Sequence, residues 1–65
     1  MEYVKFSGLR AEMAKRGHTR KTIGELIEVS EPSLSRRFSG EIDWTKSEID
    51  KICEFYNKTY EELFN

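Results

Sequence analysis

The chain has 65 residues, of which 37% are apolar and 35% are charged, and its formal net charge is −1. A chain of this length forms a single domain (residues 1–65) that buries only about 60% of its unfolded surface, which leaves no second domain for an enzyme pocket. No apolar run approaches the roughly 20 residues that span a bilayer, and the N-terminus lacks a signal-peptide layout, so we expect a cytoplasmic protein. With one cysteine and one histidine, an internal disulfide and a zinc cluster are not expected.

Charge is divided unevenly along the chain. Residues 1–40 carry eight Lys or Arg and five Glu, a net +3, whereas residues 41–65 carry three Lys and seven Asp or Glu, a net −4. The overall balance argues against a nucleic-acid partner, but this asymmetry predicts one basic face and one acidic face. A plain solvated surface is the alternative explanation.

Three apolar residues at helical spacing predict a first helix, namely Phe6, Leu9 and Met13. Lys15 and Arg16 suit the negative end of the helix dipole, and Gly17 can adopt the left-handed conformation that closes a helix. His18 follows in a short connection, where we expect it at the surface.

A second helix is predicted to begin at Thr19, whose hydroxyl can accept a bond from a first-turn N–H, and to bury Ile23, Leu26 and Ile27. Gly24 lies inside this helix. A glycine there costs about 1 kcal/mol relative to alanine, so it predicts close approach of another helix.

A third helix is bounded by Ser30 as its N-cap, Pro32 in its first turn and Gly40 at its end. Leu34 and Phe38 are its apolar residues, which predicts a narrow buried stripe and a broad polar face. Such a helix is suited to recognition from outside by a partner with an ordered array of donors and acceptors.

Two capping boxes follow, and each predicts the start of a helix. The boxes run from Thr45 to Glu48 and from Thr59 to Glu62. Apolar positions on the fourth and fifth helices are Ile49, Ile52, Cys53, Tyr56, Leu63 and Phe64. We expect Cys53 to be a small buried hydrophobe rather than a reactive thiol. Trp44 is expected to cover the third and fourth helices rather than to stack on a base.

The stretch from Thr19 to Gly40 resembles the helix-turn-helix of the lambda-repressor/Cro-like (XRE-type) family of DNA-binding domains. The resemblance continues through Arg36-Arg37-Phe38-Ser39-Gly40, Trp44-Thr45, Glu48-Ile49 and Tyr60-Glu61-Glu62-Leu63-Phe64, which look like small prophage-type regulators. It implies an all-α fold, a compact five-helix lambda-repressor-like domain with the helix-turn-helix formed by helices 2 and 3. It also implies a sequence-specific DNA-binding regulator that needs no cofactor and takes no small-molecule ligand.

The resemblance places the base-reading positions on Glu31, Pro32 and Arg36. Arg36 is the strongest candidate because arginine can pair bidentately with guanine, whereas Glu31 either accepts from cytosine or only stabilises the helix N-terminus. The other predicted contacts with double-stranded DNA are Thr19, Arg20, Lys21, Ser30, Ser33, Ser35 and Arg37. Arg20 stands where the family has a phosphate-binding glutamine.

The chain departs from the family at two places. Glu28 occupies a turn position that usually holds glycine, and the loop after Gly40 carries Glu41 and Asp43 where relatives often carry Lys or Arg. These acidic residues predict modest DNA affinity and a small salt dependence unless a dimer doubles the contacts.

Family members commonly bind inverted repeats as dimers. A homodimer is therefore predicted through the C-terminal half, with Tyr56, Tyr60, Leu63 and Phe64 at the interface. The low net charge and the acidic loop keep a second class open, a protein-binding module of antitoxin-like or anti-repressor type. An enzyme is not expected, because His18, Cys53 and the carboxylates show no paired spacing.

Overall fold

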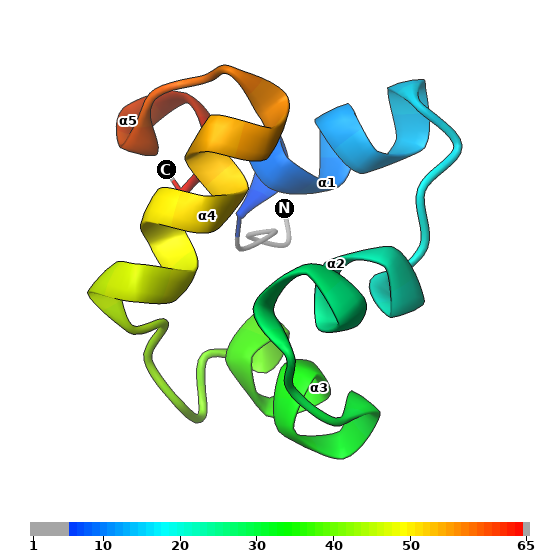
Figure 1. Ribbon diagram of the computed structural model, residues 1–65, viewed down its shortest axis with the longest axis vertical. Helices are drawn as coiled ribbons and strands as arrows, with labels where there is room; N and C mark the ends of the chain where they lie inside the picture. The colour runs from blue at the N-terminus through cyan, green and yellow to red at the C-terminus, as the bar shows by residue number, and fades with distance from the viewer. Residues whose placement is uncertain (1–5, 65) are drawn as a thin grey trace, which may run out of the picture.

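The computed structural model describes residues 6–64, and its regular structure within that range is helical (Figure 1). The helices are α1 (Ser7–Lys15), α2 (Arg20–Ile27), α3 (Glu31–Ser39), α4 (Lys46–Tyr56) and α5 (Tyr60–Leu63). The prediction of an all-α fold with five helices is confirmed. Helix α5 packs on α1, and α2 packs on both α3 and α4, so the chain closes around one core.

The core is built from large apolar side chains on every helix and from the residue after α5. They are Leu9, Met13, Ile23, Ile27, Leu34, Phe38, Ile52, Tyr56, Leu63 and Phe64. Full burial of one such side chain contributes about 1.5–3 kcal/mol, so loss of any one removes a large share of the stability of a small domain.

Local hydrogen bonds define where α4 and α5 begin. Thr45 Oγ1 accepts from the Glu48 N–H at 3.2 Å, and Glu48 Oε1 accepts from the Thr45 N–H at 3.0 Å. In the same way, Thr59 Oγ1 accepts from the Glu62 N–H at 3.2 Å, and Glu62 Oε1 accepts from the Thr59 N–H at 3.0 Å. Both predicted capping boxes are confirmed, as is Thr19 as the N-cap of α2.

The turn between α2 and α3 requires a left-handed residue, and Glu28 supplies it with φ 60° and ψ 47°. A side chain in this conformation costs about 1 kcal/mol because its Cβ crowds the backbone. Asn57 ends α4 with φ 54°, but asparagine tolerates this region better. The departure at Glu28 is therefore accommodated at the cost of backbone strain.

Two glycines lie where helices approach closely. A Cβ at Gly24 would lie 3.2 Å from the Val29 carbonyl oxygen and 3.6 Å from Leu34 Cδ2, which confirms the predicted contact with a second helix. A Cβ at Gly8 would lie 1.7 Å from the Glu62 carbonyl oxygen. Gly8 is thus what allows α1 to pack against the backbone of α5.

Trp44 is half-buried at the edge of the core, where its ring meets Phe38 of α3 edge-to-face at 5.3 Å. Its other ring neighbours are Phe6 and Phe64, at 5.9 and 5.4 Å. Trp44 therefore covers α3 as expected, but it also closes the gap between the two ends of the described chain. Burial, together with the nearby Asp50 charge, raises the pKa of the Cys53 thiol, which disfavours the reactive thiolate.

Candidate nucleic-acid interface

Helix α3 lies on the outside of the molecule, with Leu34 and Phe38 facing the core and its opposite side facing solvent. Glu31, Pro32 and Arg36 are exposed on this helix. Within residues 6–64 the Arg36 side chain forms no hydrogen bond or ion pair, so its guanidinium is open to a partner. The narrow buried stripe expected for the third helix is confirmed.

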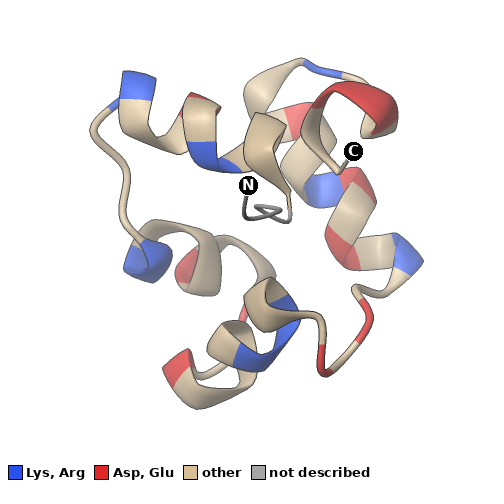
Figure 2. Ribbon diagram, turned by 180° about the vertical axis from the view of Figure 1, so that it is seen from behind, with Lys and Arg blue, Asp and Glu red and all other residues tan. Residues whose placement is uncertain are grey.

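The charge asymmetry of the sequence is only partly kept in space. Figure 2 shows Glu as well as Lys and Arg on α1, α2 and α3, whereas the charged residues of the loop after α3 are all acidic and α4 carries both signs. The N-terminus of α2 and the exposed side of α3 carry Arg20, Lys21 and Arg36, with Glu31 among them.

Thr19, Arg20 and Lys21 form the first turn of α2 and its N-cap, where unpaired N–H groups and the positive end of the helix dipole favour an anion. With Glu31 of α3 they line an open hollow of about 330 Å³ between the two helices. The floor of this hollow includes Gly24, Val29 and Leu34. The fold thus brings the predicted phosphate-binding residues next to a predicted base-reading residue.

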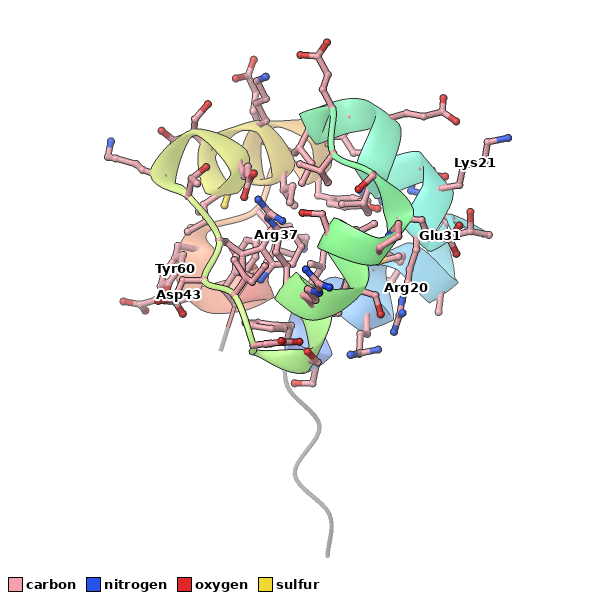
Figure 3. The ribbon with its side chains drawn as sticks, turned by 90° about the horizontal axis from the view of Figure 1, so that it is seen from below. Arg20, Lys21, Glu31, Arg37, Asp43 and Tyr60 are labelled. Carbon is pink, nitrogen blue, oxygen red and sulfur yellow. The ribbon has the colours of Figure 1, made fainter. Side chains whose placement is uncertain are left out.

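Arg20 is exposed, and its guanidinium lies against α3 (Figure 3). Its Nη1 donates to Ser35 Oγ at 3.3 Å, and its guanidinium lies 5.2 Å from the centre of the Phe38 ring. Arg10 contacts the same ring at 5.1 Å and donates to the Phe38 carbonyl oxygen at 3.4 Å. Two cations are therefore fixed beside the C-terminal half of α3.

Arg37 was predicted to contact DNA, but its side chain is turned away from solvent. Its guanidinium points to α4, where Nε and Nη2 donate to the two carboxylate oxygens of Glu48 at 2.9 and 3.0 Å. Nη1 donates to the Ser33 carbonyl oxygen at 3.1 Å and also to the Ser33 hydroxyl. The Arg37 and Glu48 side chains are only 11% and 12% exposed. Arg37 is committed to the α3–α4 contact.

This pairing changes the acidity of Glu48. Burial alone would raise the pKa of the carboxyl, but the hydrogen bonds from Arg37 and Thr45 and the positive charge of Arg37 outweigh it. The pKa of Glu48 is therefore lowered from its ordinary value, and the carboxylate is the stable form.

Ser30 is the exposed N-cap of α3, and its hydroxyl makes no capping hydrogen bond. It remains open to a partner at the start of the recognition helix. Ser33 and Ser35 are half-buried, and their hydroxyl oxygens accept hydrogen bonds from Arg37 and Arg20, respectively.

The predicted dimer surface is wrong for three of its four residues. Tyr56, Leu63 and Phe64 are buried in the core, because α5 folds back onto α1 and α4. Tyr60 is 54% exposed, and it has a neighbour that the sequence analysis missed, Ile42, which is 36% exposed. Both line an open hollow together with Asp43. Figure 3 shows Tyr60 and Asp43 on the same side of α3. We call this the Ile42–Tyr60 surface.

His18 was expected at the surface but is half-buried. Its Nδ1 lies 2.8 Å from the Tyr56 hydroxyl, which joins the α1–α2 connection to α4. Burial is the main cause that raises the pKa of Tyr56, so the phenol keeps its proton. The sequence around His18 contains nothing that predicts its contact with Tyr56.

Residues 6–64 contain neither a metal site nor a membrane-spanning helix. No group of three or more His, Cys, Asp or Glu side chains in that range could hold a metal ion. Nor is any of its helices long and apolar enough to cross a membrane.

The geometry agrees with a comparison against protein families. The model of the Helix-turn-helix family matches residues 9–63, the range that runs from α1 to the end of α5. No curated protein and no solved structure matches the chain. Because the family match covers most of the chain, and α2 and α3 form the motif, the protein belongs to the lambda-repressor/Cro-like helix-turn-helix family of DNA-binding regulators.

Proposed function

We propose that this protein is a sequence-specific transcriptional regulator of Cro or repressor type, which occupies an operator with α3 in the DNA major groove. The carrying observation is Arg36, which is exposed and unpaired on the outward side of a helix whose core side is fully packed. We further propose that residues 1–65 form one DNA-binding domain, that it has no enzymatic activity, and that it acts in the cytoplasm, where bacterial or phage DNA lies.

Arg36 is assigned to base reading. An arginine on the face of a helix in the major groove can donate two parallel hydrogen bonds to guanine O6 and N7, worth about 1–3 kcal/mol of discrimination. Glu31 and Pro32 lie one turn earlier on the exposed part of the same helix and would face the neighbouring bases. Only an N-terminal and middle segment of α3 therefore needs to enter the groove.

Phosphate binding is assigned to the N-terminus of α2 and to its surroundings. Thr19 and Lys21 are exposed beside the first-turn N–H groups, and Arg20 brings a guanidinium to the edge of α3. Ser30 and Ser35 add hydroxyl groups on the same side. Phosphate contacts of this kind set the register of a protein on the duplex without reading sequence.

A homodimer on an inverted repeat is proposed through the Ile42–Tyr60 surface. This surface lies beside α3 on the side opposite Arg20 and Lys21, so a two-fold axis there would place both recognition helices toward one DNA face (Figure 3). Two partly exposed apolar side chains cannot bury the roughly 1,000 Å² of a stable interface. The dimer should therefore form on DNA, where binding to adjacent half-sites supplies the missing free energy.

A second candidate is supported by the loop after α3. Glu41 and Asp43 are exposed on either side of Ile42, and an acidic surface around an apolar residue suits a basic protein segment better than a phosphate backbone. In this alternative the chain is an antitoxin-like or anti-repressor module that binds a protein partner.

Fluorescence anisotropy separates the two functions. Labelled random duplex is titrated with the protein at about 50 and about 200 mM salt, and sequences are then selected from a random duplex pool. Binding that weakens as the salt concentration rises, together with an enriched sequence, supports the operator function. A duplex that stays unbound at both salt concentrations contradicts it and favours the protein partner.

A further inference from the structure

Three side chains from α3 and α4 form a continuous hydrogen-bonded series that ends at the half-buried Ser33, in the first turn of the recognition helix. Glu48 binds the Arg37 guanidinium through both carboxylate oxygens, and Glu48 is itself held by the Thr45 N–H. Arg37 then donates from Nη1 to the carbonyl oxygen and the hydroxyl of Ser33, one turn earlier on α3. The series begins in the scaffold and ends next to Pro32.

The direction of these bonds decides what Ser33 can do. A guanidinium has only donors, so the Ser33 oxygen must accept, and the hydroxyl keeps its own hydrogen for another acceptor. A serine inside a helix often turns this hydrogen back to the carbonyl four residues earlier. Within residues 6–64 Ser33 forms no such bond, and its oxygen accepts from Arg37 instead.

We propose that Glu48 and Arg37 are positioning residues that hold the Ser33 hydroxyl as a hydrogen-bond donor toward an acceptor oxygen or nitrogen on DNA. The proposal rests on the DNA-binding function proposed above. The acceptor is either a phosphate oxygen, which every sequence offers, or an acceptor on a base edge. Ser33 then contacts DNA, whereas Arg37 acts through it.

The test is a double-mutant cycle with Ser33→Ala, Arg37→Lys and the double variant, measured on the selected operator duplex and on random duplex. Lysine keeps a cation beside Glu48 but lacks the fork that serves Glu48 and Ser33 together. Each single variant should weaken operator binding by about five- to tenfold, the effect of one lost hydrogen bond, and the double variant should lose no more than either single one. If the fold-losses in operator affinity of the two single variants multiply in the double variant, the proposal is overturned. Unchanged operator binding by Ser33→Ala would overturn it as well.

The two duplexes distinguish the two acceptors. If Ser33 donates to a phosphate, binding to random duplex weakens as much as binding to the operator. If Ser33 donates to a base edge, only operator binding weakens. Either result supports the proposal. Equal weakening on both duplexes assigns Ser33 to the DNA backbone, and weakening on the operator alone assigns it to sequence reading.

A salt titration separates positioning from a direct phosphate contact by Arg37. Arg37→Gln should leave the slope of log affinity against log salt unchanged, whereas the matched control Arg20→Gln should reduce it by about 0.9. An equal reduction for Arg37→Gln would show a direct contact and overturn the proposal. Near-ultraviolet circular dichroism of Trp44, which packs against Phe38 of α3, confirms that each variant is folded. Absence of salt-dependent binding by the unaltered chain would instead refute the proposed DNA-binding function itself.

Discussion

Arg37 and Glu48 join the recognition helix to α4 through two hydrogen bonds of 2.9 and 3.0 Å, in a contact largely shielded from water. Breaking a shielded pair on one side leaves an uncompensated charge, which is costly. Folding also lowers the pKa of Glu48 from its ordinary value of 4.5. A group whose pKa is lower in the folded state stabilises the fold above its unfolded pKa, and this stabilisation is lost as the pH falls through the folded pKa.

The free energy of unfolding should therefore decrease as the pH is lowered below about 4.5, and Glu48→Gln should reduce that decrease. At pH 7 the same variant should be less stable by about 1–3 kcal/mol, the value of hydrogen bonds to a charged group. Urea titrations at pH 7 and at pH 3.5 measure both effects. Glu62 also has a lowered pKa through its capping bonds with Thr59, so Glu62→Gln serves as the control that accounts for the remaining pH dependence. A Glu48→Gln variant with the full acid response of the parent chain would contradict the assignment.

Glu28→Gly should stabilise the protein. The left-handed conformation at φ 60° strains a residue with a Cβ, and glycine removes that strain at the cost of greater freedom in the unfolded chain. The expected net gain is about 0.5–1 kcal/mol in the free energy of unfolding. Asn57→Gly is the matched substitution at φ 54° and should change stability less, since asparagine already tolerates the region. A loss of stability in Glu28→Gly would mean that the glutamate side chain stabilises the turn.

Gly8→Ala should destabilise the protein by about 2 kcal/mol or more, in spite of the higher helix propensity of alanine. The added Cβ meets the Glu62 carbonyl oxygen, which belongs to backbone and cannot move without displacing α5. Gly24→Ala is the comparison, because its Cβ would lie 3.2 Å from its nearest neighbour and a small shift accommodates it. Thermal unfolding of both variants should rank Gly8→Ala as clearly the less stable.

Tyr60→Ala should leave the folded monomer nearly as stable as before but should reduce cooperative binding to a two-half-site operator. Phe64→Ala should instead destabilise the fold itself by about 3–5 kcal/mol, because its ring is buried in the core. Phe55→Ala removes a 45% exposed aromatic ring on α4 and should change neither the stability of the fold nor the cooperativity of operator binding. Sedimentation of the protein free and on operator DNA measures the dimer. A monomer in both states would exclude the proposed homodimer.

Arg36→Ala should weaken operator binding by about 1–3 kcal/mol and leave binding to random duplex less affected. Arg20→Ala should weaken both, and it should lower the salt slope by about 0.9 if the guanidinium neutralises one phosphate. Anisotropy titrations of operator and random duplex at several salt concentrations measure the affinities and the salt slopes. Equal losses on both duplexes for Arg36→Ala would contradict a base-reading role.

Much of the recognition motif can be predicted because its signals are local. Ser30, Pro32 and Gly40 bound α3 through effects that reach no further than one helical turn. The two capping boxes are equally local, since each joins a threonine to a glutamate three residues later. Gly24 predicted a close helix contact because a glycine in a helix is unfavourable unless the space beside it is used.

The partners of long side chains could not be predicted in this way. Arg36 and Arg37 are identical neighbours in the sequence, yet one is exposed and the other is bound to Glu48 eleven residues later. Their surroundings differ because successive side chains on a helix point about 100° apart, so the Arg37 side chain points to α4 and the Arg36 side chain does not. The same reason explains His18, whose partner Tyr56 lies 38 residues away.

The sequence by itself thus determined the five helices, the motif from Thr19 to Gly40 and the family, because apolar spacing and capping act over a few residues. Tertiary structure decided which polar and which apolar side chains stay exposed at the surface. Packing of α5 against Gly8 buries Leu63 and Phe64 and leaves Tyr60 outside. Packing of α4 against α3 withdraws Arg37 from the surface and leaves Arg36 as the available guanidinium at the centre of the recognition helix.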